Sequence, residues 1–222
     1  MASVQGITNT IVAALRDAGQ DNWPEAYIHK AIHEAECVIV NFRPDAFSVN
    51  ETFDCSAGIE QDISSLNDPS PHRLLSVKYN VSSGGSPGRS IRRVSVGDLD
   101  GISPDWRAAS PAGEVREFMF DEREPLLFYT NPPVAAGTKV QISYSGVPKS
   151  YGAVSGSTQT SVNDTYEPMI IEWALYRLFG QDVEGSVNVS RSQAHLNNFN
   201  SMMGIKAQGE ALTSIKDPGF RL

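Results

Sequence analysis

Over the first 47 residues, apolar residues recur with the period of an α-helix in two separate runs. Apolar residues recur at spacings of three and four over residues 4–18, which predicts a short amphipathic helix ended by Gly19. A second run covers residues 22–42, where Pro24 suits a first turn and Pro44 stops the helix. Its expected apolar face comprises Tyr27, Ile28, Ala31, Ile32, Ala35, Val38, Ile39 and Phe42.

Between residues 48 and 148 the period changes to that of β-strands. Seven short runs carry apolar residues at alternate positions, separated by segments rich in Gly, Pro and Ser. The segment SSGGSPG at 82–88 predicts a hairpin loop, and GDLDGISPD at 97–105 predicts a turn rather than a calcium loop. The runs therefore predict a small antiparallel β domain, either a sandwich or a partly open barrel.

Helical periodicity returns after a small polar linker at residues 149–159. Asp164 and Glu167 have the spacing of a capping box, and apolar residues then cover most of a helix circumference through Phe179, which predicts a buried helix. A further helix is expected from about residue 188 to 203. Residues 204–222 contain two glycines and a proline without a strong period, so they are predicted to form an extended tail.

The order of these elements predicts an α+β protein in which a β domain is inserted into a helical bundle. The buried helix near residue 170 needs apolar partners, and the N-terminal helices offer them. The expected boundaries are 1–47 with 160–203 for the bundle, 48–148 for the β domain, 149–159 for the linker and 204–222 for the tail.

Composition adds a charge asymmetry to this picture. The chain has 222 residues, is 40% hydrophobic and has a formal net charge of −8, which fits one or two domains with a core. No stretch approaches the roughly 18 apolar residues of a membrane helix, and no secretory signal is evident. Residues 1–70 hold 3 basic and 11 acidic side chains. This acidic segment, expected to be helical, should repel phosphate and make assembly depend on ionic strength.

Side chains that could carry catalysis or bind metal form no complete motif. His29, His33 and Cys37 share one helix face, but ligands on three successive turns span about 12 Å, too far for one zinc ion. The sequence contains no nucleophile-elbow or P-loop pattern. The expectation is therefore no catalytic site, no metal and no cofactor.

Two segments are candidates for contacts with partners. The cationic residues Arg89, Arg92 and Arg93 form either ordinary strand surface or a contact with the acidic first third of a neighbouring copy. The tail is either a frayed terminus or a segment that orders on a partner. Its candidate contact residues are Ile205, Leu212, Ile215, Phe220 and Arg221.

Several phrases, in their order along the chain, resemble the head-to-tail adaptor proteins of short-tailed bacteriophages, also called tail tubular protein A-like. The resemblance spans nearly the whole chain. The phrases are RLLSVKYN (73–80), IRRVSVGDLD (91–100), SPDW (103–106), PLLFYTNPP (125–133), VQISYSGVP (140–148), VNDTYEPMIIEWALYRLFGQD (162–182) and RSQAHLNNF (191–199).

The resemblance implies a structural protein of the virion neck, made in the host cytoplasm, without enzymatic activity or contact with a membrane. It implies a ring, usually of twelve copies, beneath the portal protein at the capsid vertex. DNA would pass through the ring without specific binding. The C-terminal segment would reach the portal, and the β domain would face the tail nozzle protein and tail fibres.

Three alternatives stay open at this point. The chain could be a tail-completion or nozzle component of the virion. It could be a β-rich carbohydrate-binding module, with Trp106, Tyr129 or Tyr151 as an exposed aromatic platform. A cell-envelope lyase or hydrolase is the third, although the acidic residues lack a paired catalytic pattern.

Overall fold

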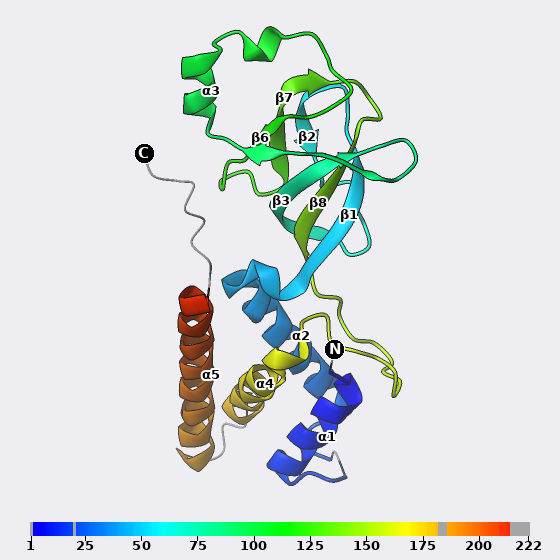
Figure 1. Cartoon of the computed structure of the whole chain (residues 1–222). Helices are drawn as coiled ribbons and strands as arrows, with labels where there is room; N and C mark the ends of the chain where they lie inside the picture. The colour runs from blue at the N-terminus through cyan, green and yellow to red at the C-terminus, as the bar shows by residue number, and fades with distance from the viewer. Residues whose placement is uncertain (1, 20, 182–185, 214–222) are drawn as a thin grey trace. The chain divides into compact units, whose positions relative to one another are not determined.

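The structure, a computed structural model, describes residues 2–19, 21–181 and 186–213 and consists of two compact units (Figure 1). The helical unit comprises residues 1–38 and 150–222, and the β unit comprises residues 39–149. The chain crosses from one unit to the other within helix α2 (Glu25–Phe42) and again after Lys149. This architecture confirms the predicted α+β class with a β domain inserted between helices.

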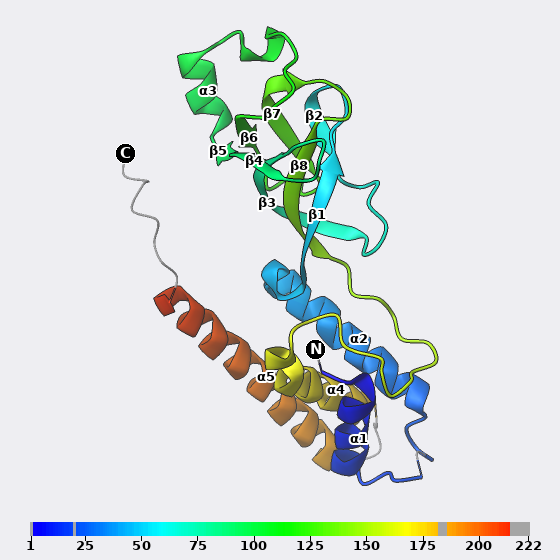
Figure 2. The same cartoon turned by 45° about the vertical axis from the view of Figure 1, so that its right-hand side comes forward.

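The helical unit is built around α4 (Glu167–Gln181), which follows the short turn η3 (Asp164–Tyr166). Helices α1 (Val4–Leu15) and α5 (Ser186–Thr213) both pack against α4 (Figure 2). Arg177 of α4 pairs with Glu34 of α2 at 2.9 Å. Apolar residues of α1 and α4 at the predicted spacing are buried, which is the packing that stabilises these helices.

Helix α1 ends earlier than predicted. Arg16, not Gly19, takes the left-handed conformation, with φ 57°, directly after Leu15. The buried Asp17 explains this exit, because its carboxylate accepts hydrogen bonds from the backbone N–H groups of Asp21, Asn22 and Trp23 at 2.9–3.1 Å. The side chain thus fixes the chain that leads into α2.

The predicted apolar face of α2 is only partly buried. Ile28, Ile32 and Ile39 are fully buried, whereas Tyr27 and Phe42 are 55% and 69% exposed. The two aromatic residues lie near the ends of the helix, where periodicity alone did not distinguish core from surface.

Helix α5 is longer than the sequence predicted. It continues to Thr213, so residues 204–213 are helical rather than the start of an extended tail. The prediction was wrong because Gly204 and Gly209 have low helix propensity and the segment lacks an apolar stripe, although a helix already begun extends at little cost. Of the predicted tail contacts, Ile215, Phe220 and Arg221 lie outside the described residues.

The β unit contains two sheets of four strands each. The first has the order β1-β8-β3-β4, formed by β1 (Ser48–Asp54), β8 (Lys139–Gly146), β3 (Pro71–Val81) and β4 (Pro87–Ser90). The second has the order β2-β7-β6-β5, formed by β2 (Gly58–Asp62), β7 (Leu127–Val134), β6 (Glu117–Met119) and β5 (Arg92–Arg93). All pairings are antiparallel except β5 with β6, which is parallel.

The two sheets face each other and join along one side. Only Ile91 separates β4 from β5. The backbone N–H of Ile91 donates a hydrogen bond to the carbonyl oxygen of Lys78 in β3, and the backbone N–H of Arg92 donates to the carbonyl oxygen of Arg116, next to β6. Phe53 and Phe128 meet edge to face between the sheets, with ring centroids 6.0 Å apart. The unit is therefore intermediate between the two architectures that the sequence left open, a sandwich closed along one side.

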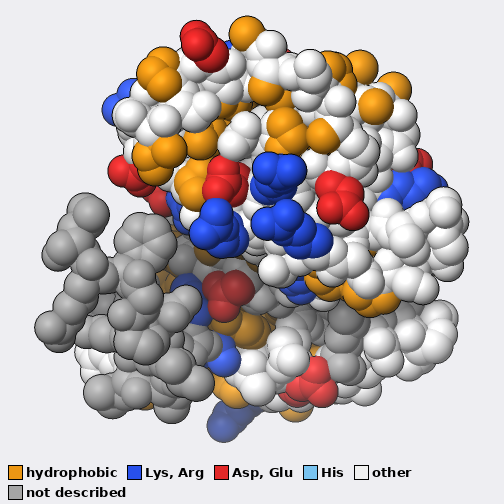
Figure 3. Space-filling view, turned by 45° about the horizontal axis from the view of Figure 1, so that its top comes forward, with side chains coloured by type: hydrophobic (Ala, Val, Ile, Leu, Met, Phe, Trp, Pro, Cys, Tyr) orange, Lys and Arg blue, Asp and Glu red, His pale blue; other side chains and the backbone are white. Residues whose placement is uncertain are grey.

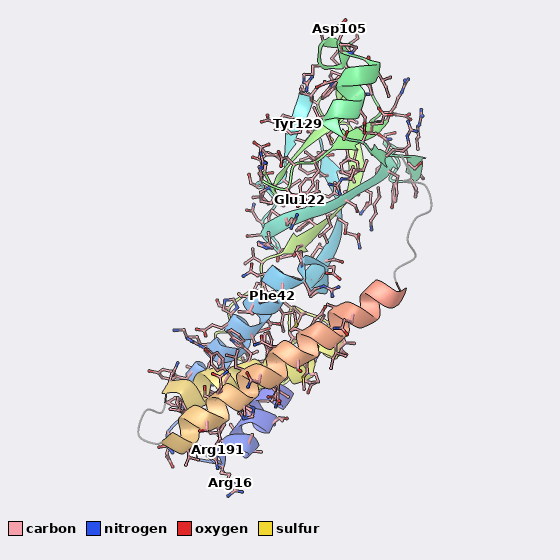
Figure 4. The ribbon with its side chains drawn as sticks, turned by 90° about the vertical axis from the view of Figure 1, so that its left-hand side faces the viewer. Arg16, Phe42, Asp105, Glu122, Tyr129 and Arg191 are labelled. Atoms are coloured by element: carbon pink, nitrogen blue, oxygen red, sulfur yellow. The ribbon has the colours of Figure 1, made fainter. Side chains whose placement is uncertain are left out.

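The segment between β5 and β6 forms helix α3 (Val96–Ile102) and the turn η2 (Trp106–Ala108), where a simple turn was predicted. Ser95 caps α3 by accepting from the N–H of Asp98. Trp106 donates to Asp100 at 2.8 Å and packs with Leu99 and Met119. A small apolar cluster therefore packs this excursion against the second sheet, and Figure 4 shows Asp105 at its outer end.

The hairpin predicted at residues 82–88 is confirmed. It joins β3 to β4, with the N–H of Ser82 donating to Ser86 and Gly85 at φ 80°. A positive φ of this size favours glycine.

Candidate interaction surfaces

A buried carboxylate holds the segment that was expected to be an exposed linker. Glu36 of α2 is fully buried and accepts hydrogen bonds from the hydroxyl of Tyr151 and from the N–H of Ser161, both at 2.6 Å. The N–H of Val162 reaches the same carboxylate at 3.4 Å. Desolvation outweighs these three donors and raises the pKa of Glu36 above its ordinary value.

Residues 150–163, which we call the strap, are also fixed to the start of the chain. The backbone N–H of Val4 donates a hydrogen bond to the carbonyl oxygen of Thr158, and the backbone N–H of Thr160 donates to the carbonyl oxygen of Ala2. Sequence reasoning missed the strap, although one signal was present: Glu36 lies four residues after Ile32 and three before Ile39, on the apolar stripe of α2. A charged residue at such a position indicates a buried polar contact.

The C-terminal part of α5 leaves the body of the helical unit. Phe199 is 1% exposed and Lys206 still contacts the unit, since its ammonium donates to Thr165 and lies 4.3 Å from the ring centre of Tyr166. Ile205 is 69% exposed, and residues 207–209 are exposed. Figures 1 and 2 show this end of α5 continuing past α4. Over residues 204–213 the structure thus presents the end of a helix as the candidate docking segment.

The cationic residues singled out in the sequence lie on one edge of the β unit. Arg89, Arg92 and Arg93 belong to β4 and β5, and all three are exposed. Arg92 pairs with Glu117 at 2.6 Å, and Arg93 lies 5.6 Å from the ring centre of Phe120. Figure 3 shows Lys and Arg side chains gathered on one face, with acidic side chains beside them.

The acidic segment is distributed differently from the expectation. Six of the eleven acidic residues in 1–70 lie at or beyond Asp45, in the β unit rather than in helices. They occupy the turn η1 (Pro44–Phe47), β1, β2 and the loop that follows β2. The picture of an acidic helical segment beside a mildly basic β domain is therefore wrong, because the strands themselves carry both signs.

The candidate metal ligands His29, His33 and Cys37 do not converge on one point in the structure. His29 is buried with its Nε2 atom 3.5 Å from Glu25, while the ring nitrogens of His33 lie 3.7–3.9 Å from the sulfur of Cys37. Among the described residues, no group of three or more His, Cys, Asp or Glu is placed to hold a metal ion. Burial raises the pKa of the Cys55 thiol to about 12, which makes this cysteine a poor nucleophile.

The aromatic platform of the carbohydrate-binding alternative is not formed. Trp106 is 3% exposed, and the hydroxyl groups of Tyr129 and Tyr151 are engaged by Glu124 and Glu36. Trp106 and Tyr129 share one small apolar cluster, whereas Tyr151 belongs to the helical unit.

The helical unit has a polar cleft of about 540 Å³ at the end where α1 stops and α5 begins. Figure 4 places Arg16 and Arg191 at this end of the unit. Of the side chains that line the cleft, Asp17 and Arg191 are charged; Asp17 already accepts three backbone donors, and Arg191 lies over the ring of Phe179. These contacts supply no pair of groups arranged for general acid and base chemistry.

Comparison with known proteins identifies one family. Residues 7–218 match the family model described as SU10 adaptor protein. No curated protein matches the chain. In the part of the chain that the structure describes, no helix combines the length and apolar character needed to cross a bilayer.

Proposed function

Because the chain belongs to the SU10 adaptor protein family, we propose that it is a structural adaptor of a bacteriophage virion, located in the neck, where it joins the portal of the head to the tail. Copies of the chain assemble into a ring, with twelve as the expected number, and the ring continues the channel for DNA. The family match over nearly the whole chain is the observation that carries this proposal.

The helix end of α5 supports the portal-facing part of the proposal. A helix that continues past its last packing contacts presents backbone already ordered, so docking on a partner costs less conformational entropy than ordering a free tail. Ile205 offers exposed apolar area on this segment, and Leu212 lies further along the same helix. We therefore assign the portal contact to residues 205–213 and to the chain that follows them.

Deleting residues 207–222 is expected to leave the protein folded and to abolish portal binding. The remaining helix ends at Lys206, the last residue with a described contact to η3, so the packing of α5 on α4 is retained. Thermal unfolding should be unchanged within a few degrees, while co-sedimentation with purified portal protein should fall to background.

A pair of single substitutions on α5 tests the same surface without shortening the chain. Ile205→Asp should weaken portal binding, and Val189→Asp, at a position of similar exposure on the same helix, should not. Equal binding by both variants and by the truncated chain would refute the assignment of the helix end. A full-length chain that binds the tail nozzle protein but not the portal would instead identify a tail-completion component.

A further inference from the structure

Each sheet of the β unit has two edge strands, and these edge strands lie at two opposite edges of the unit, one from each sheet at either edge. In each sheet the first strand of the order and the last strand are edge strands: β1 and β4 in one, β2 and β5 in the other. β1 and β2 are consecutive in the chain and share one edge, which we call the acidic edge. β4 and β5 are consecutive and share the other, the basic edge, where the two sheets join.

The chain segment that forms the acidic edge contains charged side chains of one sign only. Residues 44–70 contain six acidic and no basic side chains. Asp54, Glu60, Asp62 and Asp68 are exposed. On β2, Glu60 and Asp62 both point away from the core, because Gln61 and Ile63 between and after them are fully buried.

The basic edge carries the opposite sign. The two strands that form it, β4 and β5, contain three arginines, Arg89, Arg92 and Arg93, and no acidic side chain. All three arginines are exposed, and the side chain of Arg92 is 74% exposed in spite of its ion pair. The arginines can therefore still meet a carboxylate from outside.

Ion pairs within the unit reduce this separation of charge without removing it. Asp45 pairs with Arg43, Asp54 with Lys139 and Asp68 with Lys149 on the acidic side. Arg92 pairs with Glu117 and Arg73 with Glu122 on the basic side. After these pairs, each edge keeps an excess of its own sign.

We infer that the basic edge of one copy docks on the acidic edge of a second copy of this chain. One molecule carries both complementary surfaces on opposite edges of a single unit, so each copy has a place for a neighbour on either side. Such a contact is head-to-tail rather than two-fold symmetric, and repeated contacts of this kind close a ring or grow into a filament. The inference deepens the proposed function, and it rests on that function only for the closure of the ring.

Charge reversal tests the contact in the full-length protein. One variant combines Arg89→Glu with Arg93→Glu on the basic edge, and a second combines Asp54→Lys with Glu60→Lys on the acidic edge. Each variant alone presents edges of like charge, so its self-association constant at low ionic strength should fall at least tenfold in sedimentation equilibrium. Mixed in equal amounts, the two variants present opposite charges to each other, and association should recover.

The control makes the same change in net charge as the basic-edge variant, but away from both edges. Lys30→Glu combined with Arg16→Glu alters exposed residues of the helical unit and should associate like the wild type. Circular dichroism of each variant shows whether it is folded. Reversed variants that associate normally, a mixture that does not recover, or a wild-type chain that stays monomeric at low salt and high concentration would each overturn the inference.

The proposed function fails on a different result. Reversed variants that no longer associate should still bind isolated portal protein through α5, because that segment belongs to the helical unit. Loss of portal binding by wild-type protein would count against the adaptor function, whereas normal portal binding with unaffected self-association would count only against the edge contact.

Discussion

Replacing Phe199 with alanine is expected to lower the free energy of unfolding by about 3–5 kcal/mol and to release α5 from α4. Phe199 is 1% exposed, and its ring centre lies 5.0 Å from that of Trp173 in an edge-to-face contact. Most other side chains of α5 are exposed, so this helix depends on few anchors. Removing the largest of them leaves a cavity that the remaining contacts cannot fill.

The effect should be measured by urea unfolding and by hydrogen exchange of α5. Asn200→Ala is the matched control, because Asn200 is the next residue on the helix and is exposed. We expect the control to change stability by less than about 0.5 kcal/mol. Retained protection of α5 in Phe199→Ala would mean that the helix is held by contacts other than this ring.

The second large effect is expected at Glu36. Glu36→Ala should destabilise the protein by about 3 kcal/mol, because the Tyr151 hydroxyl and the N–H groups of Ser161 and Val162 would remain buried without their acceptor. Glu34→Ala on the same helix is the control: its partly exposed pair with Arg177 should be worth less than about 1 kcal/mol. Proteolysis within the strap should accelerate only in the Glu36 variant.

The pKa of Glu36 also predicts the sign of a pH dependence. Because its pKa is raised in the folded protein above the ordinary 4.5, the folded state holds this proton more tightly than the unfolded chain does. The stability of the wild type relative to Glu36→Gln should therefore be greatest below pH 4.5, fall as the pH rises through the folded-state pKa, and then stay constant. Denaturant titrations of both proteins between pH 3.5 and about 8 measure this difference, and an advantage that grew with pH would contradict the prediction.

The helices that face a core were predictable from sequence, because burial imposes a period of three to four residues on them. Val4, Ile7 and Ile11 of α1 show this directly, since all three are fully buried. The end of α5 was not predictable, because no core selects apolar residues there. Helix α3 was missed because it is short and contains Gly97 and Gly101, residues typical of turns.

The candidate surfaces also differ in whether a local sequence pattern was enough to predict them. Arg89, Arg92 and Arg93 could be named from sequence, since charged residues adjacent in a strand are also near each other in space. The location of the acidic residues could not, because pairing of β1 with β8 and of β2 with β7 decides which strands become edges. Those pairings join residues far apart in the chain, and no local pattern specifies them.

The strap has a mechanical consequence for the inserted β unit. The chain leaves the helical unit after Val38 and returns at Ser150, and the hydrogen bond from Tyr151 to Glu36 closes this base two residues from one crossing and one residue from the other. Tension applied to the β unit is divided between the two chain segments that connect it to the helical unit. The hydrogen bond from Tyr151 to Glu36 holds these two segments together where they enter the helical unit. A pull on the β unit would therefore act on the helical unit at this hydrogen-bonded base and would not detach the strap from its far end.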